Sequence, residues 1–93
     1  MTVLEDKLQT ELQGLHGDWQ VIFGRKLRRE FVFQNFQEGL SFVNKVGEVA
    51  EKLGHHPDVN LCYDRVVIEL WTHDLSALSE MDFAFAREIE KLV

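Results

Sequence analysis

The sequence predicts an α+β fold in which a four-stranded antiparallel sheet carries three helices on one face, in the order α-β-β-α-β-β-α. Two pairs of short segments alternate apolar and polar residues across short turns, which is typical of β-hairpins. Three longer segments carry apolar residues at helical spacing before, between and after these hairpins. Two hairpins separated by a helix favour one sheet with the helices on a single face. With 93 residues and one proline, the chain is expected to form a single domain over residues 1–93.

The first helix is expected over residues 2–15. Thr2 and Glu5 have the spacing of a capping box, which marks a helix start. Four leucines fall on one stripe of this helix, namely Leu4, Leu8, Leu12 and Leu15. The stripe predicts that the helix packs against the core through that side.

The first hairpin is expected to pair residues 19–23 with residues 27–33. Trp19, Val21 and Phe23 share one side of the first strand. One side of the second strand carries Leu27, Arg29, Phe31 and Phe33. Because a charged side chain does not suit a core, Arg29 is the member that needs an explanation. Residues 24–26 are expected to form the connection.

The middle helix is expected to begin at Asn35, with Glu38 at capping spacing, and to end at Gly54. Apolar residues recur along it at helical spacing: Phe36, Leu40, Val43, Val46, Val49, Ala50 and Leu53. Gly39 and Gly47 each cost about 1 kcal/mol of helix propensity relative to alanine. We therefore expect close packing against the sheet or another helix at both glycines.

The second hairpin is expected to join residues 57–63 to residues 66–71, with Asp64 and Arg65 in the turn. Val66, Ile68 and Leu70 alternate with their neighbours and define one core face of the second strand.

The last helix is expected to begin near Ser79, which has capping spacing to Asp82, while Leu78 and Phe83 match a hydrophobic staple. Residues 83–86 are consecutively apolar. A helix that is apolar on most sides must bury more than one face. We therefore expect a homodimer or homotetramer that uses this helix and the sheet edge.

Composition and charge exclude several classes of function. No apolar run approaches the ~18 residues of a membrane span, and the N-terminus lacks the basic and apolar blocks of a secretory signal, so we expect a cytoplasmic protein with no membrane partner. The net charge of −6 opposes nucleic-acid binding. Cys62 is the only cysteine, which rules out an internal disulfide and a thiolate zinc cage.

The basic cluster of Arg25, Lys26, Arg28 and Arg29 is either a patch for an anion or a solvated hairpin face.

Three of the four histidines, His55, His56 and His73, lie within residues 53–74. A metal site is one interpretation, but adjacent side chains point in different directions in a helix or strand, and no cysteine completes a ligand set. A second interpretation is structural, because cationic side chains are favourable just after a helix end. The third is acid–base catalysis by imidazoles that converge on one cleft.

Two carboxylates bear on this third interpretation. Glu51, one turn before His55, either orients an imidazole or is a solvated helix residue. Asp82 either polarises the site from the last helix or serves only as part of the cap at Ser79.

The spacing of these residues resembles the signature of the pterin-4a-carbinolamine dehydratases. In order, the matching positions are Glu51, the tripeptide KLG, His55-His56-Pro57, Tyr63 after five residues, His73 after nine more, and Asp82 after eight more. The resemblance extends from about Trp19 onward. Its family fold, a four-stranded antiparallel sheet with three helices on one face, agrees with the order read from the residues.

The resemblance implies dehydration of a 4a-hydroxytetrahydropterin to quinonoid dihydropterin, in tetrahydropterin recycling and without metal or cofactor. The three histidines would carry catalysis, with His55 and His73 as the acid–base pair and His56 helping to bind the pterin. Further pocket residues implied by the resemblance are Pro57, Thr72 and Asp74.

The same resemblance leaves a second function open. Non-catalytic relatives act as dimerisation cofactors of transcription factors or as assembly factors for Rubisco, and here the last helix would then be the partner surface. Two segments depart from the family pattern. Residues 59–61 lack the usual aromatic, and Ser76-Ala77 replaces a pair of glycines, which would strain the loop if it needs a positive φ.

Overall fold

A computed structural model describes residues 5–93 and confirms the predicted order of elements. The helices are α1 (Glu5–Gln13), α2 (Phe36–Leu53) and α3 (Glu80–Glu90), and a short 3-10 turn, η1, spans His73–Leu75. The strands are β1 (Gln20–Ile22), β2 (Lys26–Val32), β3 (Asp58–Leu61) and β4 (Arg65–Leu70). The predicted capping box of Thr2 and Glu5 includes a residue outside the described range, and Leu4 of the predicted stripe also lies outside it.

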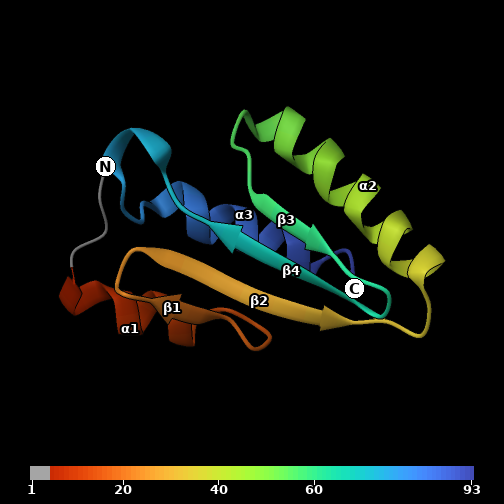
Figure 1. The fold of residues 1–93 in the computed structure, drawn as a ribbon. Helices are drawn as coiled ribbons and strands as arrows, with labels where there is room; N and C mark the ends of the chain where they lie inside the picture. Colours follow the sequence, from red (N-terminus) through yellow and green to blue (C-terminus); the bar gives the residue numbers. More distant parts are fainter. Residues whose placement is uncertain (1–4) are drawn as a thin grey trace.

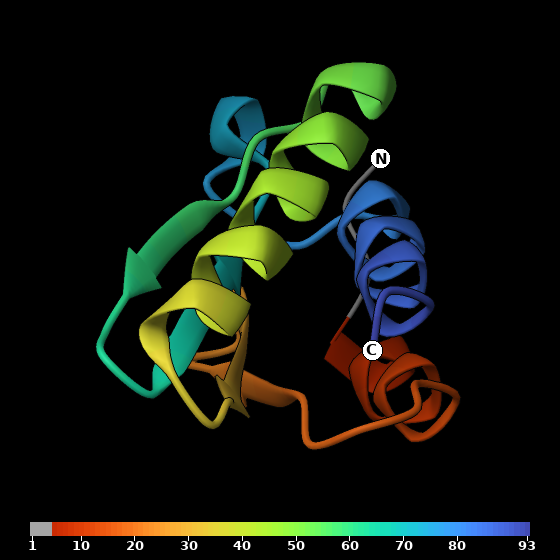
Figure 2. The ribbon, with the colours of Figure 1, turned by 90° about the vertical axis from the view of Figure 1, so that its right-hand side faces the viewer.

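The four strands form one antiparallel sheet in the order β1-β2-β4-β3. All three helices lie on the same face of this sheet, with α3 between α1 and α2 (Figures 1 and 2). The ends of β4 and α2 and the start of β3 lie toward the same end of the sheet, where the η1 turn follows β4 (Figure 1). This end is where the histidine-bearing segments come together.

The core lies between the sheet and the helices. Leu27 faces Leu70 across β2 and β4, Phe31 faces Val66, and these four side chains are buried. Burial of apolar side chains in this layer supplies the main favourable term of folding.

Arg29, the charged residue on the core side of β2, has a counter-charge from the far end of the chain, although its buried Nε makes no hydrogen bond. Its guanidinium pairs with the Glu90 carboxylate, which also accepts a hydrogen bond from Trp19 Nε1 at 2.9 Å. The guanidinium carbon lies 4.1 Å from the centre of the Phe31 ring. A buried charge is tolerated when it is paired in this way, so the alternation predicted for β2 holds despite the arginine.

The outer face of the sheet carries a ladder of opposite charges. Glu69 lies 3.7 Å from Lys26 and 3.8 Å from Arg28, and Glu30 lies 3.9 Å from Arg65. Because most of the basic cluster of the hairpin is matched by glutamates, the geometry favours a solvated face over an anion site.

Phe23 does not share the buried side of the first strand, as the alternation had suggested. The strand ends at Ile22, and Phe23 sits in the turn with φ 54° and 93% of its side chain exposed. The turn closes through the hydrogen bond from Arg25 N–H to the Ile22 carbonyl at 3.0 Å. The connection therefore begins one residue earlier than expected.

Helix α2 has both predicted caps. The Asn35 side chain accepts a hydrogen bond from Glu38 N–H, and Gly54 ends the helix in the left-handed conformation at φ 64°. The expected stripe is partly wrong, since Phe36 and Leu53 at the two ends are exposed and the buried residues include Phe42.

The two helix glycines differ in their surroundings. A Cβ on Gly39 would lie 3.1 Å from Leu61 Cδ1, so this glycine allows the close approach of α2 to the sheet. A Cβ on Gly47 would meet no atom within 4 Å among the described residues, so the expectation of close packing there is wrong for the single chain.

Two boundaries of the second hairpin also move. Strand β3 covers only Asp58–Leu61, and Arg65 belongs to β4 rather than to the turn. The turn is closed by the hydrogen bond from Cys62 N–H to the Arg65 carbonyl at 2.8 Å, and Phe33 N–H, just after β2, bonds the Asp64 carbonyl at 2.7 Å.

Helix α3 starts with the predicted capping box between Ser79 and Asp82. Three of the four residues of its apolar run are covered within the chain, because Phe83, Phe85 and Ala86 are each 0% exposed. Ala84 is exposed. The chain itself therefore covers the residues for which a partner subunit was expected, and an oligomer contact through the exposed side of α3 stays a prediction.

Candidate functional site

The three clustered histidines all line one cleft at the end of the sheet, although the first and the last are 18 positions apart in the sequence. The cleft has a volume of about 280 Å³, near the lower end of the range for small-molecule sites. It is lined by Gly54, His55, His56, Thr72, His73, Asp74 and Met81. The C-terminus of α2, the end of β4 and the first turn of α3 contribute these residues.

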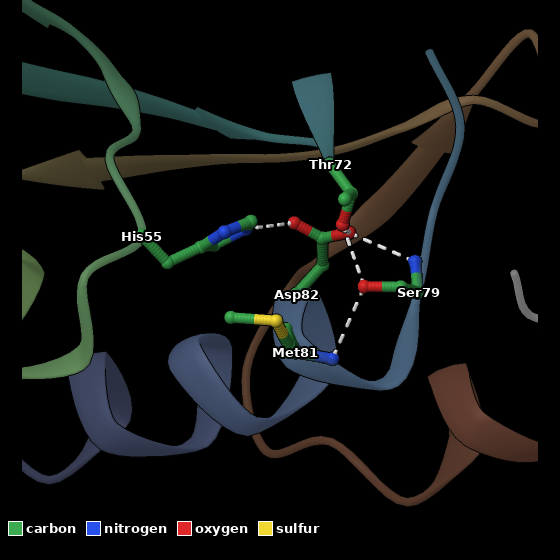
Figure 3. Close-up of polar contacts among 5 residues, drawn as sticks. All are labelled: His55, Thr72, Ser79, Met81 and Asp82. Atoms are coloured by element: carbon green, nitrogen blue, oxygen red, sulfur yellow. Dashed lines mark hydrogen bonds and ion pairs between the residues drawn. The ribbon is translucent and has the colours of Figure 1, made fainter. Parts of the chain in front are cut away.

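His55 is turned into the protein by the left-handed turn at Gly54. Its backbone N–H bonds the Ala50 carbonyl at 3.1 Å, and its side chain is 91% buried with the ring edge toward Phe85. The ring nitrogen Nε2 lies 2.6 Å from Asp82 Oδ1 (Figure 3). This contact joins residues 27 positions apart in the chain.

Asp82 is fully buried and serves both as helix cap and as partner of His55. Its second oxygen, Oδ2, accepts hydrogen bonds from the Thr72 hydroxyl at 2.8 Å and from Ser79 N–H at 2.9 Å (Figure 3). The Thr72 and Ser79 hydroxyls lie 2.5 Å apart. Hydrogen-bond partners reach both carboxylate oxygens, so the buried side chain is satisfied. Asp82 therefore makes the cap contact at Ser79 and also contacts His55, and its action on the site stays a prediction.

The Asp82 carboxylate bears on which nitrogen of His55 can act. An ionised carboxylate can only accept hydrogen bonds, so beside it His55 donates its Nε2–H. A neutral ring in this hydrogen bond carries no proton on Nδ1, and that nitrogen makes no hydrogen bond within residues 5–93. A histidine held in this way is suited to accept a proton and to be stabilised by the carboxylate once it is charged.

His56 points to solvent and pairs with Glu51. Its Nε2 lies 2.5 Å from Glu51 Oε2, and both side chains are mostly exposed. Glu51 was expected either to orient an imidazole or to be a solvated helix residue, and the structure shows an exposed glutamate whose imidazole contact is with His56 and not with His55. The reason is that the chain leaves the helix at Gly54 and directs two successive side chains to opposite sides.

His73 begins the η1 turn and is exposed at the mouth of the cleft. Over residues 5–93, neither of its ring nitrogens makes a hydrogen bond. Both nitrogens are thus open to solvent or to a bound molecule.

The remaining expected pocket residues divide into two groups. Thr72 and Asp74 line the cleft, whereas Pro57 lies outside it and borders two neighbouring hollows beside β3. Met81, which the sequence did not single out, lines the cleft from the first turn of α3. Ser79, noted only as a cap, contributes its hydroxyl to the Thr72 and Asp82 network.

The loop after η1 does require a positive φ. Ser76 adopts φ 48°, and its N–H bonds the His73 carbonyl at 3.2 Å, while Thr72 and Ala77 form a bridge that closes the loop. A non-glycine residue in this conformation costs about 1 kcal/mol. The loop keeps its shape at this cost, and the strain lies at Ser76 and not at Ala77.

Other features of the surface offer less chemistry. A larger, apolar groove of about 940 Å³ runs along α2 and includes Val43, Gly47 and Val59. Only one histidine, His56, lines this groove, together with Glu51 and Pro57. Within the described range, no three His, Cys, Asp or Glu side chains are placed to hold one metal ion, and no helix is long and apolar enough to cross a membrane.

Comparison with known proteins decides the family. Residues 1–92 match the family model described as pterin 4 alpha carbinolamine dehydratase. The chain belongs to this family. Two bacterial relatives carry the provisional name pterin-4-alpha-carbinolamine dehydratase. The one from Alkaliphilus metalliredigens is 46% identical over 92% of this chain and 78% of its own length. The one from Rubrobacter xylanophilus is 42% identical over 94% of this chain and 78% of its own length.

Solved structures of the pterin dehydratase family share the fold. A Brucella melitensis protein described as a transcriptional coactivator/pterin dehydratase superposes with a TM-score of 0.91 at 32% identity, covering 99% of this chain and 98% of its own. A pterin dehydratase-like protein described as a RuBisCO assembly factor in the alpha-carboxysome superposes with a TM-score of 0.70 at 25% identity. The match covers 83% of this chain and 90% of that protein's chain. The fold thus occurs in proteins described in different functional terms.

Proposed function

We propose that this protein catalyses the dehydration of a 4a-hydroxytetrahydropterin to quinonoid dihydropterin, as a hydro-lyase in tetrahydropterin recycling. The single observation that carries the proposal is the His55–Asp82 pair at the base of a cleft that two further histidines line. Membership of the pterin carbinolamine dehydratase family supplies the substrate class.

The reaction breaks the bond between carbon 4a and the hydroxyl oxygen, and the products are the quinonoid pterin and water. One proton is delivered to the departing hydroxyl and one is removed from a ring nitrogen of the pterin, so that no other reactant is consumed. Histidine rings suit both transfers because they exchange protons near neutral pH. In our proposal His55 and His73 form the acid–base pair.

The other residues of the cleft bind and orient the substrate. His56, steadied by Glu51, supplies a donor or acceptor at the rim, and Thr72 and Asp74 offer polar groups to the pterin edge. Asp82 acts through His55, because the Asp82 carboxylate is fully buried and its oxygens are taken up by protein donors.

The test is a dehydratase assay in which a phenylalanine hydroxylase generates the 4a-hydroxypterin in situ and dihydropterin formation is followed by absorbance. We expect acceleration over the spontaneous rate, which His73→Ala abolishes without loss of folding. His16→Ala is the matched control, since His16 is an exposed histidine outside the cleft. Unchanged turnover in His73→Ala would remove His73 from the mechanism, and a folded wild-type protein without acceleration would refute the enzyme.

A second candidate is a protein-binding module, favoured by the two structural relatives described as a coactivator and as an assembly factor. The buried α3 leaves little apolar surface for a partner, so the groove along α2 would have to serve. Under this alternative, substitutions in the cleft leave binding to the partner protein intact, whereas Val43→Glu in the groove abolishes it.

We also propose a homo-oligomer that forms through the sheet edge. Strand β3 is an edge strand, and Val59 on it is 38% exposed beside the α2 groove. Unpaired edges are common sites of strand addition. Light scattering that gives a strictly monomeric mass would count against this proposal.

A further inference from the structure

The three cleft histidines are held in different ways. His55 and His56 are each held through Nε2 by a carboxylate, at 2.6 and 2.5 Å. His73 has no such contact in the described part of the chain, but its ring stacks on the Trp71 indole with the centroids 4.5 Å apart and the planes 19° from parallel. The indole thus holds the third imidazole through its face rather than through a nitrogen.

Trp71 is itself fixed from the neighbouring strand. It directly follows Leu70, the last residue of β4, which pairs with Leu27 of β2, and Lys26 beside Leu27 contacts its ring. The Lys26 ammonium lies 4.4 Å from the centre of the indole and also pairs with Glu69 at 3.7 Å. A cation over an indole face is favourable, and the glutamate keeps the lysine in place.

We infer that Trp71 is a positioning residue for His73, holding the imidazole at the mouth of the cleft while leaving both ring nitrogens free. The inference rests on the proposed function, because it assigns Trp71 a role in that reaction. A histidine that moves protons between substrate and solvent needs access at its nitrogens. A stacking contact provides orientation without occupying either one.

The expected effect follows from the freedom that the ring would gain. An exposed histidine without a partner can occupy three χ1 wells and a broad, roughly two-fold χ2. Release from a single orientation therefore lowers the productive fraction about fivefold. The loss falls on kcat, because Trp71 does not line the cleft and makes no contribution to substrate binding in this account.

The experiment compares Trp71→Ala and Trp71→Phe with the wild-type protein and with Val67→Ala. Val67 lies on the same outer face of β4 and has no stacking contact with His73, so it controls for loss of apolar surface there. We expect kcat of Trp71→Ala to fall about fivefold with KM nearly unchanged, whereas Trp71→Phe retains most of kcat because phenylalanine also offers a ring face. Val67→Ala keeps the wild-type kcat.

A second measurement is independent of activity. The indole ring current should move the ring-proton NMR resonances of His73 upfield, with assignment by comparison with His73→Gln. We expect these resonances to return downfield in Trp71→Ala and to stay upfield in Val67→Ala. Identical His73 resonances in the wild type and Trp71→Ala overturn the inference, as does an unchanged kcat.

A higher KM at constant kcat in Trp71→Ala also overturns the inference, because it would make Trp71 a substrate contact. If the wild-type protein shows no dehydratase activity, the proposed function fails and the catalytic role of Trp71 fails with it. The NMR resonances still report in that case whether the indole holds the imidazole. The two failures are therefore distinguishable.

Discussion

The substitution Asp82→Asn changes little volume at the candidate site but alters its chemistry. The carboxylate accepts one hydrogen bond from His55 on one oxygen, and two from Thr72 and Ser79 on the other. Since Ser79 N–H can only donate, the asparagine oxygen must remain on that side, and its NH₂ group then faces His55 Nε2. Neutral His55 must therefore accept at Nε2 and carry its proton on Nδ1.

Two effects follow from this reversal. A hydrogen bond to a charged group contributes about 1.5–3 kcal/mol, so we expect the free energy of unfolding to fall by about 2 kcal/mol. For a chain of this length that is a fall in Tm of about 8–16 °C. Turnover should fall by about 10²-fold or more, because His55 can no longer take a proton at Nδ1.

Thermal denaturation by circular dichroism measures the first effect, and the dehydratase assay measures the second. Glu51→Gln is the matched control, since it makes the same chemical change beside His56 at an exposed pair. Surface pairs of this kind contribute about 0–1 kcal/mol, so its Tm should move far less. An Asp82→Asn variant with wild-type turnover would show that the tautomer of His55 is irrelevant to the reaction. An unchanged Tm would show that the buried network does not depend on a charge.

Three further predictions concern stability and can be checked by thermal or urea denaturation. Ser76→Gly should stabilise the protein by about 1 kcal/mol, because φ 48° suits glycine, and a lower Tm would contradict this. Gly47→Ala should stabilise by about 0.5–1 kcal/mol, whereas Gly39→Ala should gain less because its Cβ meets a side chain at 3.1 Å; equal gains would refute the difference in packing. Glu90→Gln should destabilise by about 1–3 kcal/mol, because it leaves the half-buried Arg29 without a counter-charge, and an unchanged urea midpoint would show that this pair contributes nothing.

Local signals in the sequence were sufficient for the helix ends that carry a cap. The caps at Asn35, Gly54 and Ser79 act within a few residues of themselves, and all three are present. Phe23 was placed wrongly because alternation alone does not say where a strand stops. A hairpin turn that needs a positive φ can take a phenylalanine when its side chain is free to point into solvent.

The partners of the charged and titratable groups could not be predicted in the same way. The pairs Arg29–Glu90 and His55–Asp82 join residues 61 and 27 positions apart, and the packing of α3 against the sheet and against the end of α2 brings them together. The clustering of three histidines marked them as candidates, but the spacing did not say which imidazole Glu51 contacts. Trp71 carried no signal at all, because an aromatic residue on a strand is ordinarily assigned to packing.

The turn at Gly54 has a consequence for the reactivity of the two adjacent histidines. It sends one ring into the interior and its neighbour into water, with side-chain exposures of 9% for His55 and 61% for His56. A reagent that acylates imidazole therefore reaches His56 and His73 in the folded state, whereas the ring of His55 becomes available only when the chain opens around it. The two adjacent histidines should therefore be acylated at different rates. The slower rate, that of His55, reports on the opening of the native structure.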